Sequence, residues 1–106
     1  LKYNVGDSGA PQVLAMGRGK IAEDIMKKAS EHNVTIFQSP LLARALYYTS
    51  NIGDEISEKL YNAVAIALAY IYKLDQGESL IEPTIVVPND LQFDEFGNKQ
   101  VGDLNA

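Results

Sequence analysis

The sequence of 106 residues contains no cysteine and only one histidine, His32. Without cysteine the chain cannot form disulfides, thiolate zinc sites or a cysteine nucleophile, and this composition is compatible with a reducing cytoplasm. One histidine cannot build a multi-histidine metal site. Because His32 follows an amphipathic segment, we expect it to act as a cation at the end of a helix rather than as a catalytic base.

Long hydrophobic runs are also absent. The longest uninterrupted apolar run, residues 63–72, is about half as long as a membrane-spanning helix requires. The sequence does not open on a basic stretch followed by an apolar one, so it lacks the pattern of a signal peptide. We therefore expect a soluble chain, whose length is typical of a single domain with a modest core.

Charge is distributed unevenly along the chain. Residues 1–74 carry eight basic and seven acidic side chains, a net charge of +1, whereas residues 75–106 carry one basic and seven acidic side chains, a net charge of −6. This division predicts a near-neutral domain over 1–74 and an acidic, proline-containing tail over 75–106. The absence of a cluster of Lys and Arg argues against nucleic-acid binding, which needs phosphate contacts.

The first half of the chain has the pattern of an α/β fold. Residues 13–16 and 34–37 are short apolar runs typical of buried strands, and residues 19–32 between them repeat apolar side chains at helical spacing. A strand, a helix and a second strand predict a right-handed βαβ unit with parallel strands. Ser39 and Pro40 mark the beginning of another helix, because serine caps helices and proline fits their first position.

The longest predicted helix covers residues 58–74 and has two apolar stripes. The stripe with the spacing of a buried face comprises Leu60, Val64, Ala67, Ile71 and Leu74. The second stripe comprises Tyr61, Ala65, Leu68 and Tyr72. A helix packed on one face of a small domain needs only one stripe. The second is therefore either covered by another part of the chain or open to a partner.

The tail after residue 74 contains few apolar residues. We expect it to be flexible, because it buries too little surface to offset the entropy of ordering. The apolar residues 85–87, in the segment EPTIVVP, leave a second interpretation open. They could dock as an edge strand or in a groove on the domain itself.

The turn GRGK at residues 17–20 is the one feature that resembles a phosphate-binding loop. Arg18 and Lys20 beside glycines at the beginning of a helix form a candidate anion or nucleotide site. The turn lacks the GxxxxGK[ST] pattern, and its alternative role is a turn between strand and helix. No group of acids and histidine has the spacing of a metal or acid–base site, so we predict a protein that is not an enzyme.

Residues 1–74 resemble a known protein family along their whole length. The segments APQVLAMGRGKIA, NVTIFQSPLLARALYYTSNIGDEIS and EKLYNAVAIALAYIYKL are similar to the cytoplasmic domain of the FlhB family, which includes SpaS, YscU and EscU. The tail segment EPTIVVPNDLQFD is similar to the tail of its flagellar members. These proteins belong to flagellar and type III export systems, where they help to switch the class of exported substrate.

This resemblance implies a small mixed sheet surrounded by about three to four helices, placed at the cytoplasmic face of the inner membrane. It implies export substrates, their chaperones and other export-gate proteins as partners, and no cofactor. It also implies a shallow apolar patch that receives a short hydrophobic export signal. The patch positions of the family fall on Ala10, Pro11, Ala65 and Leu68.

The sequence departs from the family pattern at several positions. Relatives that switch cleave themselves between Asn and Pro in an NPTH motif, and no Asn-Pro pair occurs in this sequence. Gln12 and Met16 replace residues that are often basic, and Ser57 stands where proline is usual. Two interpretations remain open: a cleavage fragment or other piece of a switch protein, and a small stand-alone homologue. The acidic tail and the lack of a membrane portion favour the stand-alone form.

Overall fold

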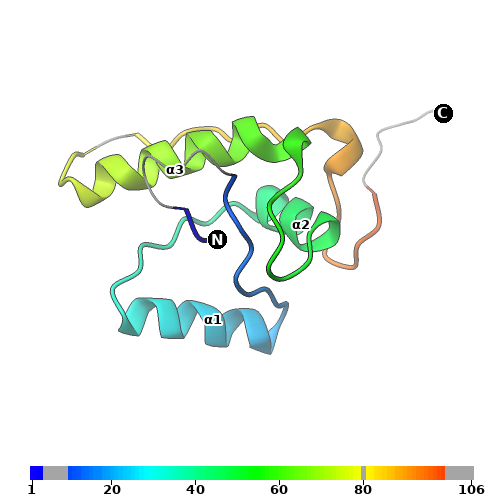
Figure 1. The fold of residues 1–106 in the computed structure, drawn as a ribbon, viewed down its shortest axis with the longest axis horizontal. Coiled ribbons are helices and arrows are strands. Elements are labelled where there is room, and N and C mark those ends of the chain that lie inside the picture. Colours follow the sequence, from blue (N-terminus) through cyan, green and yellow to red (C-terminus); the bar gives the residue numbers. More distant parts are fainter. Residues whose placement is uncertain (4–9, 80, 100–106) are drawn as a thin grey trace.

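The computed structural model describes residues 1–3, 10–79 and 81–99 of the chain. Three α-helices follow one another as α1 (Lys20–Glu31), α2 (Pro40–Thr49) and α3 (Tyr61–Asp75). Short 3-10 turns, Glu58–Leu60 and Asn89–Leu91, precede α3 and interrupt the C-terminal segment. Figure 1 shows α3 as the long upper helix, with α2 beside it and α1 below both.

Local signals explain where the helices begin and end. Gly19 precedes α1 with a φ angle of 59°, and Asn33 follows it with a φ of 59°, so both ends use left-handed backbone. The ring Nδ1 of His32 lies 2.9 Å from the carbonyl oxygen of Lys28 at the C-terminal end of α1. Helix α2 begins with Pro40, whose missing N–H is not needed at that position.

Ser57 caps the 3-10 turn Glu58–Leu60, which leads into α3. The hydroxyl oxygen of Ser57 accepts a bond from the backbone N–H of Lys59 at 3.3 Å. Along the first stripe of the helix, Leu60, Val64 and Ala67 are buried in the core. They belong to the same core cluster as Leu42 and Ala45 of α2, so both helices contribute to the core.

The expectation of an α/β fold with a small mixed sheet and a βαβ unit is wrong. The described residues contain only isolated antiparallel bridges, two of which join Gln12 to Lys2 and to Glu55. The second expected strand, residues 34–37, forms none of these bridges, and the side chain of Val34 is 58% exposed. The N–H of Val34 instead donates to the carbonyl of Ala29 and helps to end α1. The apolar run 34–37 is thus a connection between helices rather than a strand.

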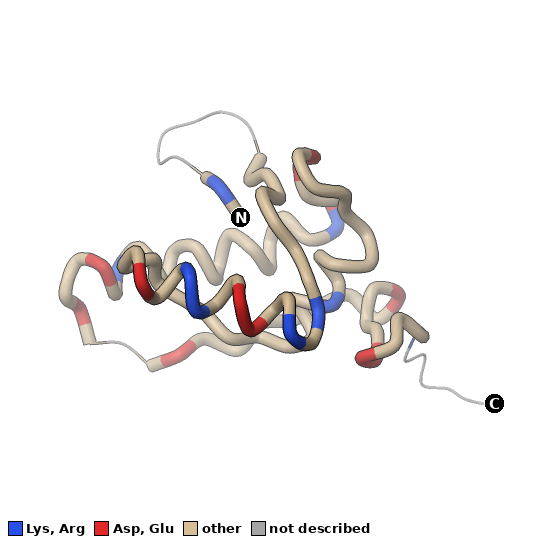
Figure 2. Tube along the Cα trace, turned by 90° about the horizontal axis from the view of Figure 1, so that it is seen from below, with Lys and Arg blue, Asp and Glu red and all other residues tan. Residues whose placement is uncertain are grey.

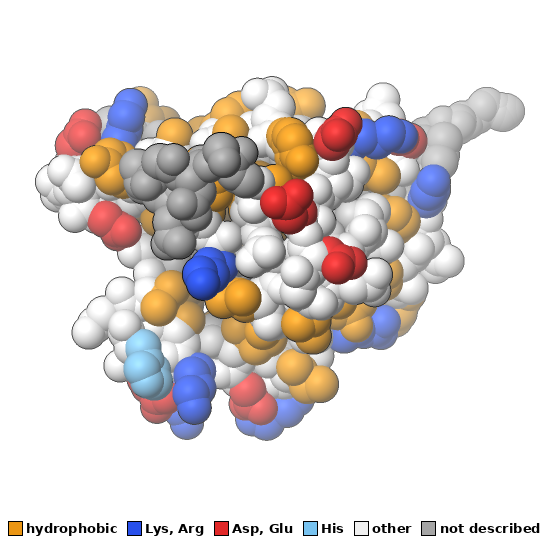
Figure 3. Space-filling model, in the orientation of Figure 1, with side chains coloured by type: hydrophobic (Ala, Val, Ile, Leu, Met, Phe, Trp, Pro, Cys, Tyr) orange, Lys and Arg blue, Asp and Glu red, His pale blue; other side chains and the backbone are white. Residues whose placement is uncertain are grey.

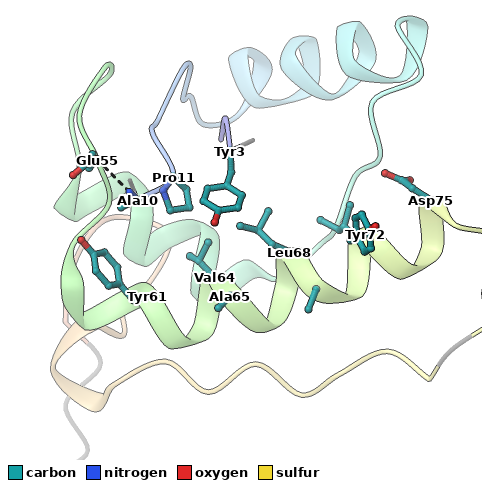
Figure 4. A pocket seen from close by; sticks show the side chains of 12 residues that line it. Tyr3, Ala10, Pro11, Glu55, Tyr61, Val64, Ala65, Leu68, Tyr72 and Asp75 are labelled. Atoms are coloured by element: carbon teal, nitrogen blue, oxygen red, sulfur yellow. Dashed lines mark hydrogen bonds between the residues drawn. The ribbon is translucent and has the colours of Figure 1, made fainter. Parts of the chain in front are cut away.

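The described part of the tail packs against the domain, so the expectation of a flexible tail does not hold there. The side chains of Val87, Leu91 and Phe93 belong to the buried core. The ring of Phe93 lies 5.3 Å from the ring of Tyr48 on α2, whose hydroxyl donates to the carbonyl of Glu95 at 3.0 Å. Figures 1 and 4 show the segment from residue 81 running beside α3 in the opposite direction.

Helix α1 is the least buried of the three helices. None of its residues is buried, and its apolar side chains Ile21 and Met26 are 59% and 39% exposed. Figure 2 shows basic and acidic residues alternating along its outer face, where Lys20 pairs with Asp24 at 2.9 Å. Figure 3 shows hydrophobic side chains gathered on the face between α1 and α3. Helix α1 therefore rests on the domain through partial contacts.

Candidate functional site

A cavity of about 780 Å³ lies between α3 and the N-terminal segment. Figure 4 shows that α3 forms one wall, while the chain around Tyr3, Ala10 and Pro11 forms the other. The lining residues named in Figure 4 are Tyr3, Ala10, Pro11, Glu55, Tyr61, Val64, Ala65, Leu68, Tyr72 and Asp75. We call this cavity the α3 groove.

All four patch positions implied by the family resemblance line the α3 groove. Ala65 and Leu68 stand on neighbouring turns of α3, and Ala10-Pro11 faces them from the opposite wall (Figure 4). The pair 10–11 is more than fifty positions away along the chain, so the fold brings the two halves of the patch together. Short alanine side chains beside a proline leave a shallow apolar recess suited to one side chain of an extended peptide.

The wall opposite α3 is held by backbone hydrogen bonds. The N–H of Ile56 donates to the carbonyl of Pro11 at 3.0 Å, and the N–H of Ala10 donates to the Glu55 carboxylate at 3.2 Å. Lys2 and Gln12 exchange two bonds of 2.8 and 3.0 Å. Ala10 and Pro11 are thereby fixed between the segment at residue 2 and the loop at residues 53–56.

The second stripe of α3 lines the groove in full. Tyr61 and Tyr72 are 42% and 51% exposed, Ala65 is exposed, and Leu68 is half-buried against the core. The described C-terminal residues contribute nothing to the lining, because their contacts with α3 are on another side of the helix (Figure 4). The second stripe was expected to be either covered by another part of the chain or open to a partner. Among the described residues it is open.

Two carboxylates mark the ends of the α3 groove. Glu55 lies near the N-terminal end of α3, and Asp75 lies at its C-terminal end, where it accepts a bond from the Thr35 hydroxyl. No Lys, Arg or His is among the lining residues that the structure describes. The sequence pattern did not indicate these acids, because only the fold brings them to an apolar stripe.

The two residues of the candidate anion site make contacts within the protein. Arg18 donates to the Tyr48 hydroxyl at 3.4 Å, and the Lys20 ammonium pairs with Asp24 at 2.9 Å. Gly17 approaches Ile21 so closely that an added Cβ would lie 2.2 Å from its side chain. This contact gives the turn a packing role, and an anion site at residues 17–20 stays a prediction.

The perturbed carboxyl groups lie in the C-terminal segment, away from the groove. A hydrogen bond from the Lys59 ammonium, 2.9 Å away, lowers the pKa of Asp90. Bonds from the backbone N–H groups of Asn98 and Phe96 lower the pKa of Asp94. Both shifts come from contacts that fix the segment to itself and to the domain, so they indicate structural roles.

The described residues give no support to a metal site or to a membrane-spanning helix. They include no group of three or more His, Asp and Glu arranged to hold a metal ion. No helix within the described ranges is long and apolar enough to cross a membrane. A second apolar hollow, of about 550 Å³, lies along α1 beside Ile21, Ile25 and Val34.

The sequence matches a known protein family. The profile of the FlhB HrpN YscU SpaS family matches residues 1–71, about two thirds of the chain. The chain therefore belongs to this family. The crystal structure of the cytoplasmic domain of FlhB from Shewanella putrefaciens is similar to it with a TM-score of 0.73 and 40% identity. That match covers 87% of this chain and 75% of the other.

Curated relatives extend the similarity. The flagellar biosynthetic protein FlhB of Escherichia coli is 38% identical over 88% of this chain, and that of Aquifex aeolicus is 45% identical over 67%. A match over 88% of the chain is longer than residues 1–74, so the similarity to the first of these proteins extends into the tail. The chain spans only 26% and 20% of the length of these two proteins.

Proposed function

We propose that this chain acts in flagellar or type III protein export by binding a short apolar segment of export substrates in the α3 groove. The proposal rests on one observation: Ala10, Pro11, Ala65 and Leu68 all line the same cavity of about 780 Å³. Family membership supports the setting, because curated members of this family are flagellar biosynthetic proteins.

The groove suits a binding role rather than a catalytic one. Its floor is apolar and its walls are fixed, which favours a ligand held by burial of side chains. A peptide that fills the recess between Pro11 and Leu68 removes apolar surface from water without rearranging the domain. We therefore propose a non-enzymatic component without a cofactor, which takes part in switching between classes of export substrate.

The proposed partners and location rest on membership of the same family. Export substrates with their chaperones, and other proteins of the export gate, are the proposed partners. The similarity to a cytoplasmic domain supports a place at the cytoplasmic face of the inner membrane.

The test is to introduce a charge into the patch without disturbing the core. Ala65→Asp is the suitable change, because Ala65 is exposed and lies in the groove. Burying a carboxylate against an apolar ligand is costly, so we expect binding of substrate N-terminal peptides to weaken at least tenfold. Ala43→Asp, at an exposed alanine of α2 outside the groove, is the matched control.

Calorimetric titration measures the affinity, and circular dichroism verifies that each variant is folded. Peptide binding by Ala65→Asp at the wild-type affinity would refute the proposal that the patch receives substrate.

A further inference from the structure

The two ends of the α3 groove are negatively charged, although the floor between them is apolar. Glu55 lies at one end and Asp75 at the other, and no cationic side chain lines the groove within the described residues. Two tyrosines of α3 line the same groove, Tyr61 in the first turn of the helix and Tyr72 in its last turn. Both rings are about half exposed, at 42% and 51%.

A groove lined by carboxylates and by exposed aromatic rings suits lysine or arginine side chains. A carboxylate attracts the cation, and a ring face adds a cation–π contact. Both acids are partly engaged already, by the N–H of Ala10 and the hydroxyl of Thr35. Each of these bonds uses one oxygen, and an ionised carboxylate has capacity for several donors.

The length of the groove sets the spacing of the cations. An α-helix rises about 1.5 Å per residue, so Tyr61 and Tyr72 lie about 17 Å apart along the axis and Asp75 about 5 Å further. An extended peptide advances about 3.3 Å per residue. Two basic side chains about five to six residues apart would therefore reach both ends while apolar side chains between them fill the patch.

From this arrangement we infer that the groove selects extended apolar peptides with a basic residue at each end and rejects peptides with acidic ends. The inference rests on the proposed function, because it specifies the chemistry of the peptide that the patch receives. Glu55 and Asp75 are then the residues that determine charge specificity, while Ala65 and Leu68 provide the apolar contact.

The test compares three seven-residue peptides with blocked termini and one apolar centre, Ala-Leu-Ala-Leu-Ala. Their ends carry two lysines, two glutamines or two glutamates, and each is titrated into the full chain by calorimetry. At an ionic strength of about 0.02 M, where screening is weak, we expect each carboxylate to contribute about two- to fivefold in affinity. The lysine peptide should bind most tightly and the glutamate peptide most weakly, and the order should fade at about 0.5 M salt.

The double variant Glu55→Gln, Asp75→Asn removes both charges but keeps oxygen acceptors for Ala10 and Thr35. It should bind the three peptides with nearly equal affinity. Glu23→Gln changes an exposed acid on α1, away from the groove, and should keep the wild-type preference.

The possible failures are distinguishable. Equal affinity of the wild type for the three peptides, or a preference that survives in the double variant, would overturn the charge inference and leave the apolar patch intact. Failure of all three peptides to bind at millimolar concentration would instead refute the proposed function itself.

Discussion

The buried position of Phe93 predicts that the C-terminal segment is part of the folded unit. Its side chain is 7% exposed and packs on Tyr48, whereas Phe96, three residues later in the same segment, is 68% exposed. Phe93→Ala therefore removes a large side chain from the core, and Phe96→Ala removes the same atoms from the surface. The two variants make the same chemical change at nearby positions, so Phe96→Ala is the control for Phe93→Ala.

The magnitude follows from burial. Replacing a core phenylalanine with alanine costs about 3–5 kcal/mol, and the peripheral position of Phe93 places it near the lower end, at about 3 kcal/mol. Such a loss is a large share of the 5–15 kcal/mol that typically stabilises a domain. For a chain of this size it lowers the melting temperature by about 15 °C. Phe96→Ala should change the free energy of unfolding by less than about 0.5 kcal/mol.

The assay is urea unfolding followed by far-ultraviolet circular dichroism. With a slope of about 1.5 kcal/mol per molar urea, Phe93→Ala should move the midpoint down by about 2 M and leave the slope unchanged. Equal stability of the two variants would show that the segment does not belong to the core. The packing of residues 81–99 against α2 and α3 would then be wrong.

Two further predictions concern the same segment. Gly97 and Gly77 both have positive φ angles, of 88° and 85°, but a Cβ at Gly97 would lie 2.7 Å from the Tyr48 ring, whereas at Gly77 it meets open space. Thermal unfolding should show a cost of about 1 kcal/mol for Gly77→Ala and clearly more for Gly97→Ala, and equal costs would contradict the contact. Asp94→Ala should destabilise the protein above about pH 4; because the pKa of Asp94 is lowered in the folded state, this difference should fade as the pH falls through that lowered value. A difference in the free energy of unfolding that grows as the pH falls below about 4 in urea titrations would contradict the sign.

The helices were predictable from the sequence because their signals are local. The cap at Ser57 begins the 3-10 turn that leads into α3, and the proline at position 40 and the glycine at position 19 lie at the beginnings of α2 and α1. The apolar stripes of α3 depend only on helical spacing, which is why the second stripe could be identified from the sequence, although not whether it is covered. The resemblance to the family, carried by long matching segments, assigned two of the four expected patch residues, Ala65 and Leu68, to that stripe.

The errors came from contacts between distant parts of the chain. An apolar run of four residues has no strand character until another segment pairs with it, and residues 34–37 have no bridge among those described. The tail was judged by its low apolar content, yet Val87, Leu91 and Phe93 all reach the core. Ile85 and Val87 are two positions apart, as are Leu91 and Phe93, and each pair has the spacing of a segment with one buried side. The 3-10 turn Asn89–Leu91 separates the pairs. The acids of the groove had no local signal at all.

The two sides of α3 have different surroundings. Ala63 and Ala67 face the core that α2 and the C-terminal segment complete, while Ala65 and Tyr72 face the open groove. The C-terminal segment packs on the core side and stabilises the helix there. The residues 85–87, which the sequence allowed to dock in a groove, do not line the α3 groove. Mutations on the core side should therefore change stability more than peptide affinity at temperatures where the protein remains folded, and mutations on the groove side should do the reverse.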